Sequence, residues 1–93
     1  NPELLQNYPN PFNAATQIQY RIINNSLVKL SVFDVSGKKV FPLPEKLRSG
    51  GNVFSETLNM NRFASGLYFC RLEVHDLKTG RHIFRTRKMI LAK

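Results

Sequence analysis

The chain has 93 residues, a length that accommodates one domain with one modest hydrophobic core. Its hydrophobic content of 42% and aromatic content of 11% exclude an intrinsically disordered segment, and no apolar run reaches the ~20 residues that a membrane-spanning helix needs. The net charge of +8 could attract nucleic acid, but no nucleic-acid-binding motif accompanies it, so we expect a solvated basic surface.

The first stretch, residues 1–15, predicts an extended lead-in. Pro9 and Pro11 fix φ and forbid a helix, and they bias the residues before them toward extended conformations. Tyr8 and Phe12 are expected to anchor this stretch against the body of the domain. We therefore predict a docked segment rather than a free linker.

The remaining residues, 16–93, alternate between apolar and polar side chains in several short stretches and show no helical period. The predicted strands lie at 16–22, 27–34, 38–41, 52–58, 68–74 and 82–92. Turns rich in glycine, asparagine or proline separate them, and Asp34–Gly37 is predicted to form a tight reversal. This pattern predicts an all-β fold, an antiparallel β-sandwich of six or seven strands.

The stretch 68–74 is the clearest strand. Tyr68, Cys70, Leu72 and Val74 share one face, which we expect to be buried. The single cysteine excludes an internal disulfide and a cysteine-based zinc site. A thiol on the inner face is expected to behave as a small, inert apolar group.

Two strands have irregular patterns. The inward face of 52–58 is ambiguous, because Val53 lies at an odd-numbered position and Phe54 and Leu58 lie at even-numbered ones, which face opposite sides of a strand. In the last strand the apolar residues switch parity between Phe84 and Met89, which predicts a β-bulge near Arg85–Arg87.

Candidate chemistry is sparse. The acidic residues fall mostly in turns or on outward faces, so we expect no enzyme activity. His75 and His82 flank the predicted turn at 76–80 and should lie opposite each other across a hairpin. With Asp76 they could hold a metal loosely, but exposed cross-strand histidines are the simpler interpretation, and we expect no metal and no other cofactor.

Four pieces of sequence occur in a characteristic order. They are Tyr8-Pro9-Asn10-Pro11-Phe12-Asn13, Val32-Phe33-Asp34-Val35-Ser36-Gly37-Lys38-Lys39-Val40, Ser65-Gly66-Leu67-Tyr68-Phe69 and Lys88-Met89-Ile90-Leu91. Over nearly the whole chain, this order resembles the type A C-terminal sorting domain of the type IX secretion system. The resemblance implies that the β-sandwich is Ig-like. The resemblance implies structural motif positions at Tyr8, Pro9, Asn10, Pro11, Phe12, Asp34, Gly37, Gly66 and Tyr68. The sequence departs from the family at Ala14, Ala15, Leu58 and Cys70.

The resemblance implies a domain at the C-terminal end of a larger secreted protein of Bacteroidetes-type bacteria. The cargo, a hydrolase or adhesin, would pass through the periplasm. The domain would then be recognised by the outer-membrane translocon and often removed by a sortase, which leaves the cargo secreted or on the cell surface. The chain ends at Lys93, just after the last motif, as a natural C-terminus would.

The basic last strand is where we expect recognition, through its charge and through an open backbone edge. The expected recognition residues are Arg85, Arg87, Lys88, Met89, Ile90, Leu91 and Lys93. The alternative is an Ig-like accessory module that binds carbohydrate or protein beside a secreted hydrolase. Outward-facing Phe33 and Phe69 would be its platform.

Overall fold

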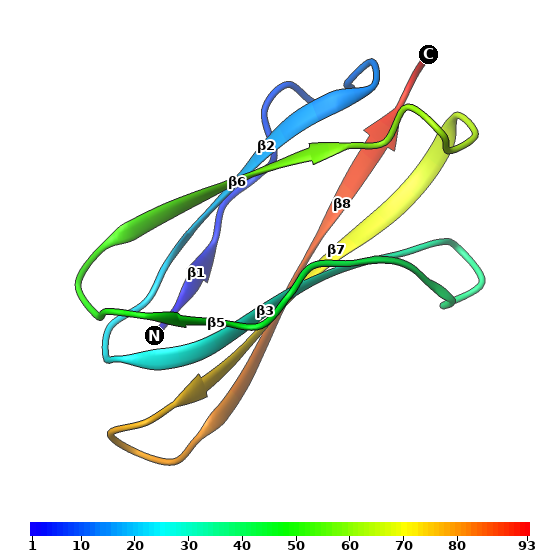
Figure 1. The fold of residues 1–93 in the computed structure, drawn as a ribbon. Coiled ribbons are helices and arrows are strands. Elements are labelled where there is room, and N and C mark those ends of the chain that lie inside the picture. The colour runs from blue at the N-terminus through cyan, green and yellow to red at the C-terminus, as the bar shows by residue number, and fades with distance from the viewer.

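The computed structural model describes residues 1–93 as two antiparallel sheets packed face to face (Figure 1). The smaller sheet has the order β1-β2-β6, and the larger has the order β4-β3-β7-β8, with β5 paired to the start of β3. The strands are β1 Glu3–Leu4, β2 Ala15–Arg21, β3 Ser26–Phe33, β4 Lys39–Pro42, β5 Lys46–Arg48, β6 Val53–Asn59, β7 Gly66–Asp76 and β8 His82–Leu91. The predicted all-β sandwich is confirmed.

All six predicted strands are present, and two short ones are additional. β1 consists of two residues of the lead-in, which pair with Tyr20 and Arg21 of β2. β5 consists of three residues between the predicted strands 38–41 and 52–58, and it pairs with residues 26–28 of β3. Neither strand is long enough to produce an alternation that a sequence pattern can reveal.

The core lies between the two sheets and is built from the inward positions of the long strands. Ile18 and Tyr20 of β2 face Leu30, Val32 and Leu72 of the larger sheet, and each of these side chains is at most 3% exposed. Burying one such side chain contributes about 1.5–3 kcal/mol relative to leaving it in water. Alternating side chains on strands of both sheets thus explain why this sequence closes as a sandwich.

The face of β6 that the sequence leaves ambiguous is settled by its register with β2. Phe54 and Leu58 point inward, and the Phe54 ring lies 5.7 Å from that of Tyr20. Val53 points outward and is 49% exposed. The mixed sequence pattern therefore arises because one apolar residue of β6, Val53, faces solvent.

The β-bulge predicted near Arg85–Arg87 is wrong. The ladder between β7 and β8 is continuous from the Gly66–Leu91 pair to the His75–His82 pair. Phe84 is an outer-face residue whose ring lies 5.2 Å from the Arg71 guanidinium. Apolar residues occur at both odd and even positions of β8 because some of them face the core and others face outward, not because the register shifts.

The reversal between β3 and β4 forms as predicted. The Asp34 side chain accepts hydrogen bonds from the backbone amides of Ser36 (2.9 Å) and Lys38 (3.0 Å), and Gly37 has φ +86°. The hydrogen bonds from Ser36 and Lys38 hold the pKa of the Asp34 carboxyl below its usual value. The one register shift of the larger sheet lies here, between Val32 and Phe33.

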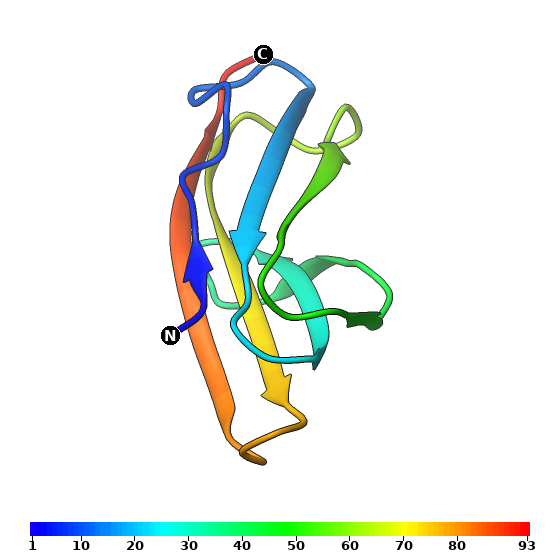
Figure 2. The same cartoon turned by 90° about the vertical axis from the view of Figure 1, so that its left-hand side faces the viewer.

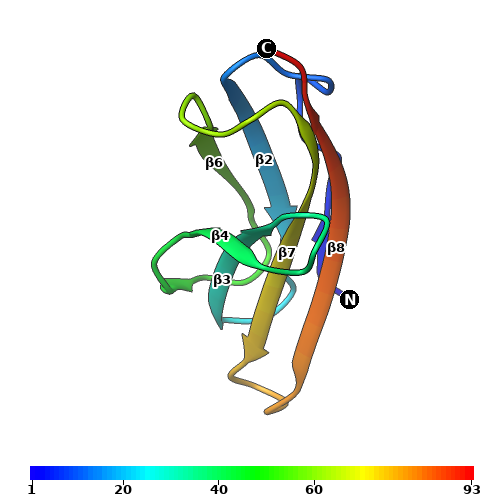
Figure 3. The same cartoon turned by 90° about the vertical axis from the view of Figure 1, so that its right-hand side faces the viewer.

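The two sides of the sandwich differ. On one side the lead-in runs alongside β8 (Figure 2). On the other, β6 and β4 end the two sheets with no strand between them (Figure 3). None of the elements is a helix of the length and hydropathy required to cross a bilayer.

Candidate recognition site

The C-terminal segment, defined as residues 85–93, forms the second half of β8 and the chain beyond it. Its outer backbone edge is paired with the lead-in. The Phe12 amide donates to the Ile90 carbonyl and the Ala92 amide donates to the Phe12 carbonyl, both at 2.9 Å. Phe12 and Leu91 thereby form a parallel bridge.

Two polar side chains of the lead-in occupy the rest of this edge. Gln6 donates from Nε2 to the Lys88 carbonyl at 2.8 Å, and Asn10 Oδ1 accepts from the Ile90 amide at 2.9 Å. The open backbone edge expected for the last strand is therefore wrong at residues 88–92. A partner cannot add a strand there while the lead-in stays in place.

Arg85 and Arg87 point toward the lead-in from the inner face of β8. Arg85 Nε donates to the Pro2 carbonyl at 3.2 Å, and Arg87 Nε donates to the Leu4 carbonyl at 2.9 Å. Charge-assisted bonds of this kind are stronger than neutral ones. These two arginines hold the first residues of the chain against its last strand.

Met89 and Leu91 belong to the core. Their side chains are 0% and 1% exposed, and Phe12 of the lead-in joins the same core at 2%. These positions are thus inaccessible from solvent in the folded domain.

An exposed apolar surface with one cation lies on the opposite face of the segment. Ile90 is 45% exposed and pairs across the strands with Leu67, which is 37% exposed. Lys88 pairs with Phe69 beside them, and its side chain makes no ion pair. We call these four residues, Leu67, Phe69, Lys88 and Ile90, the outer patch.

Lys93 extends past the strand toward the loop between β6 and β7. Its amide donates to Ser65 Oγ at 3.0 Å, and its Nζ donates to the Asn61 carbonyl at 2.9 Å. The segment therefore divides into three groups: Lys88 and Ile90 face solvent, Arg85, Arg87 and Lys93 bond to the domain, and Met89 and Leu91 fill the core.

The lead-in lies against the rest of the domain, and only one of its two aromatic residues serves as an anchor. Phe12 is buried, whereas the Tyr8 side chain is 81% exposed, so the anchoring role predicted for Tyr8 is wrong. Its backbone amide and carbonyl instead bond to Gln17 of β2 at 3.0 and 2.9 Å. Asn7, which the sequence does not single out, is 3% exposed and donates to the Pro9 carbonyl at 3.1 Å.

The histidine pair lies where the hairpin prediction places it. His75 and His82 face each other across β7 and β8, and their rings stack with centroids 4.2 Å apart. The Asp76 side chain is engaged elsewhere, because it accepts from Asn24 Nδ2 and from the Lys78 amide at 2.9 Å each. No group of three or more histidine, cysteine, aspartate or glutamate side chains is close enough to hold a metal ion.

Cys70 is buried on the inner face of β7, as predicted. Burial raises the pKa of its thiol to about 12. The thiolate, which is the reactive form, is therefore scarce at neutral pH.

The sequence profile of the secretion system C-terminal sorting domain matches residues 6–86. The chain belongs to this family. The membership confirms the resemblance to the type IX sorting domains. The matched range contains the lead-in motif from Tyr8 to Phe12 as well as Asp34, Gly37, Gly66 and Tyr68, and it stops before Lys88.

Comparison with solved structures adds support for the fold alone. The soluble domain of PmoD from Methylocystis sp. ATCC 49242 superposes with a TM-score of 0.65 at 15% sequence identity, over 99% of this chain and 90% of that chain. A search of curated proteins found no match.

Membership of the family has coarse functional consequences. It implies a domain that works with the type IX secretion machinery on behalf of a larger, exported cargo protein. Sorting domains of this family are typically non-catalytic.

The accessory-module alternative is not favoured. Its proposed platform includes Phe33, whose ring is approached by the Arg71 guanidinium at 5.0 Å and by Lys39 Nζ at 5.8 Å. A sugar ring would have to displace these cations before it could stack on Phe33.

Proposed function

We propose that this sorting domain directs its cargo to the outer-membrane translocon of the type IX system, and that the outer patch together with Lys93 is the surface that the translocon recognises. The cargo is then released to the medium or retained on the cell surface, with removal of the domain by a sortase. The single observation that carries the proposal is the family match, which identifies the chain as a sorting domain.

The properties of the outer patch support the choice of surface. Exposed apolar side chains that adjoin one another are typical of protein docking sites. Leu67 and Ile90 supply the apolar area, and Lys88 supplies a positive charge that no acidic side chain of the domain neutralises.

The other residues of the C-terminal segment support recognition indirectly. Arg85 and Arg87 fix the lead-in, and Met89 and Leu91 fix β8 in the core. Deleting residues 85–93 would therefore block sorting through loss of the fold as well as through loss of contacts, so deletion alone is not a sufficient test.

Point variants of the outer patch separate these causes. The chain is fused to a reporter with an inner-membrane signal peptide and expressed in a bacterium that has a type IX system. The double variant Lys88→Glu and Ile90→Thr should leave the reporter in the periplasm, whereas the unchanged domain should deliver it outside. Arg81→Glu, which makes the same charge change on the distant hairpin, is the matched control.

Fluorescence or circular dichroism in urea must show that the variants fold as the parent does. Normal delivery by the folded double variant would contradict the choice of the outer patch. Failure of the unchanged domain to deliver the reporter, in a strain that exports its own cargo, would contradict the sorting function itself.

A further inference from the structure

The edge strands of the sandwich differ in how they are protected against pairing with another chain. β1 has two residues, and the edge of β8 is covered by the lead-in. β4 has four residues and ends at Pro42, and β5 has three residues, two of which are Lys46 and Arg48. Shortness, proline, cationic side chains and covering segments are the usual means of blocking strand addition.

β6 has none of these protections. It is seven residues long, contains no proline, lysine or arginine, and pairs with β2 in a continuous register. Its one charged residue, Glu56, points inward and bonds to Lys46 Nζ and Arg48 Nη2 at 2.9 Å each, so its charge is neutralised within the domain.

The backbone groups on the free side of β6 are unpaired. The Gln17 amide and carbonyl bond to Tyr8, so the odd-numbered residues of β2 face the lead-in and the even-numbered ones face β6. By the same alternation, four residues of β6 direct their amides and carbonyls away from the sheet, and no strand pairs with them. These residues are Val53, Ser55, Thr57 and Asn59.

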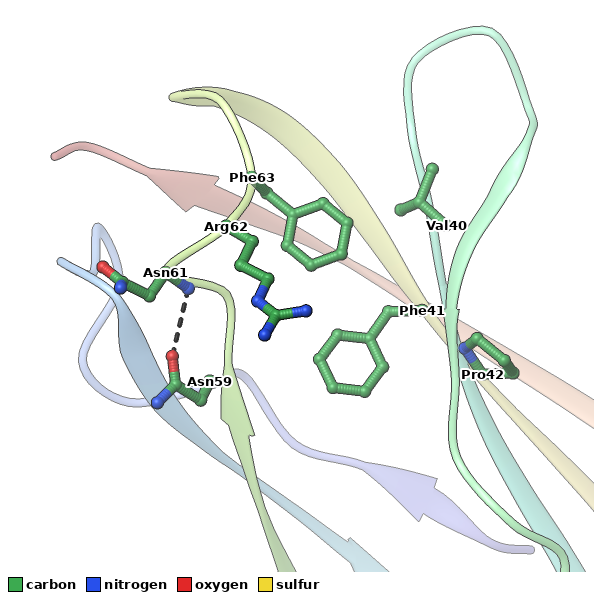
Figure 4. Close-up of a pocket in the computed structure, with 7 residues that line it drawn as sticks. All are labelled: Val40, Phe41, Pro42, Asn59, Asn61, Arg62 and Phe63. Atoms are coloured by element: carbon green, nitrogen blue, oxygen red, sulfur yellow. Dashed lines mark hydrogen bonds between the residues drawn. The ribbon is translucent and has the colours of Figure 1, made fainter.

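A groove of about 550 Å³ adjoins the end of this edge (Figure 4). Phe41 of β4 and Phe63 of the following loop line it, with ring centroids 5.9 Å apart and planes inclined by 19°. Asn59 belongs both to the groove and to the free edge. A strand added to β6 would direct alternate side chains inward, toward the side of the sheet on which the groove lies.

The groove carries a positive charge. Figure 4 shows the Arg62 side chain extending over the groove from the same loop as Phe63. Arg62 forms no ion pair, and no acidic residue lines the groove. The domain as a whole carries a net charge of +8, which favours an acidic occupant further.

We infer that β6 and this groove bind an extended acidic peptide segment of a partner protein by strand addition. The peptide backbone pairs with Val53, Ser55 and Thr57. One aromatic or large apolar side chain enters the groove between β4 and the loop, and a carboxylate two residues away, on the same face of the peptide strand, bonds to Arg62. This surface lies apart from the outer patch, and the inference does not depend on the sorting proposal.

A second copy of the chain fits the site less well. Two β6 strands paired edge to edge would bring together two domains that each carry a charge of +8. The inward side chains of β6, among them Phe54 and Leu58, are already packed in their own core and could not fill a neighbour's groove.

The test uses the whole chain, labelled with ¹⁵N, and two synthetic peptides. The acidic peptide is Thr-Asp-Thr-Phe-Thr-Asp-Thr, in which both aspartates share a strand face with the phenylalanine, and the matched basic peptide has lysine in place of both aspartates. The acidic peptide should shift the amide resonances of Val53, Ser55, Thr57 and Asn59. The basic peptide should bind at least about tenfold more weakly, since a charge-assisted bond contributes roughly that factor.

Two pairs of variants complete the test. Thr57→Pro removes an amide that faces away from β2, so the fold is retained while binding of the acidic peptide is lost; Thr57→Val is its control and should bind normally. Arg62→Glu should weaken binding by about tenfold, whereas Arg81→Glu should leave it unchanged.

The inference is overturned if the acidic peptide does not bind at millimolar concentration, if it shifts resonances of β8 instead, or if Thr57→Pro binds it as well as the parent does. Sedimentation that shows the parent chain as a dimer and Thr57→Pro as a monomer would assign the edge to a second copy and would equally overturn the inference.

Discussion

Two aromatic residues of the same lead-in motif provide a matched test of how the N-terminal segment is held. Phe12 is 2% exposed within the core, whereas Tyr8 is 81% exposed and its backbone makes hydrogen bonds to Gln17. Phe12→Ala removes a buried ring and leaves a cavity that Leu91 and Met89 can fill only in part. Such substitutions cost about 3–5 kcal/mol, a large share of the ~5–15 kcal/mol that stabilises a small domain. Tyr8→Ala should change stability by less than about 0.5 kcal/mol.

The assay is urea unfolding of both variants and the parent, followed by circular dichroism at neutral pH. We expect the midpoint to fall strongly for Phe12→Ala and to stay in place for Tyr8→Ala, with similar slopes. An equal or larger loss for Tyr8→Ala would refute the reasoning, because it would mean that the Tyr8 ring packs on the domain in solution.

Three further predictions follow from single contacts. The hydrogen bond from Arg71 lowers the pKa of Glu73. The contribution of this carboxylate to the unfolding free energy should therefore be constant at pH values above its usual pKa of 4.5, and it should be lost as the pH falls through the lowered pKa. Glu73→Gln should remove this part of the pH dependence in urea titrations at several pH values. Cys70 should react with a maleimide reagent only in denaturant, and fast labelling of the native chain at pH 7 would contradict its burial. Arg87→Ala should increase the hydrogen-exchange rate of the lead-in amides by roughly tenfold, whereas Arg81→Ala should leave it unchanged. Mass spectrometry of peptic fragments measures this rate in both variants.

The strands and turns could be predicted because their signals are local. The alternation of Tyr68, Cys70, Leu72 and Val74 determines which face of β7 is buried, and this face is buried in the structure. The reversal at Asp34 depends on bonds within four residues of that side chain. Such patterns need no knowledge of the rest of the fold.

The roles of individual residues in the C-terminal segment could not be predicted, because they depend on which distant segment lies opposite. Arg85 and Arg87 resemble solvent-exposed basic residues in the sequence, yet each bonds to a carbonyl 83 positions away. Phe84 resembles a core residue and instead packs on Arg71 at the outer face. The groove beside Phe63 likewise arises only when the loop after β6 meets β4.

The contacts between the lead-in and β8 have a consequence for how the domain forms. They join positions 82 and 83 residues apart, so the loop that they close spans most of the domain. Closing so large a loop costs entropy before any contact compensates for it, so we expect this step to come late in folding. A nascent chain interrupted before Arg85 lacks both arginines and the buried residues of β8. The cell therefore obtains a folded sorting domain only on polypeptides whose synthesis has passed this strand, and incomplete cargo remains without one.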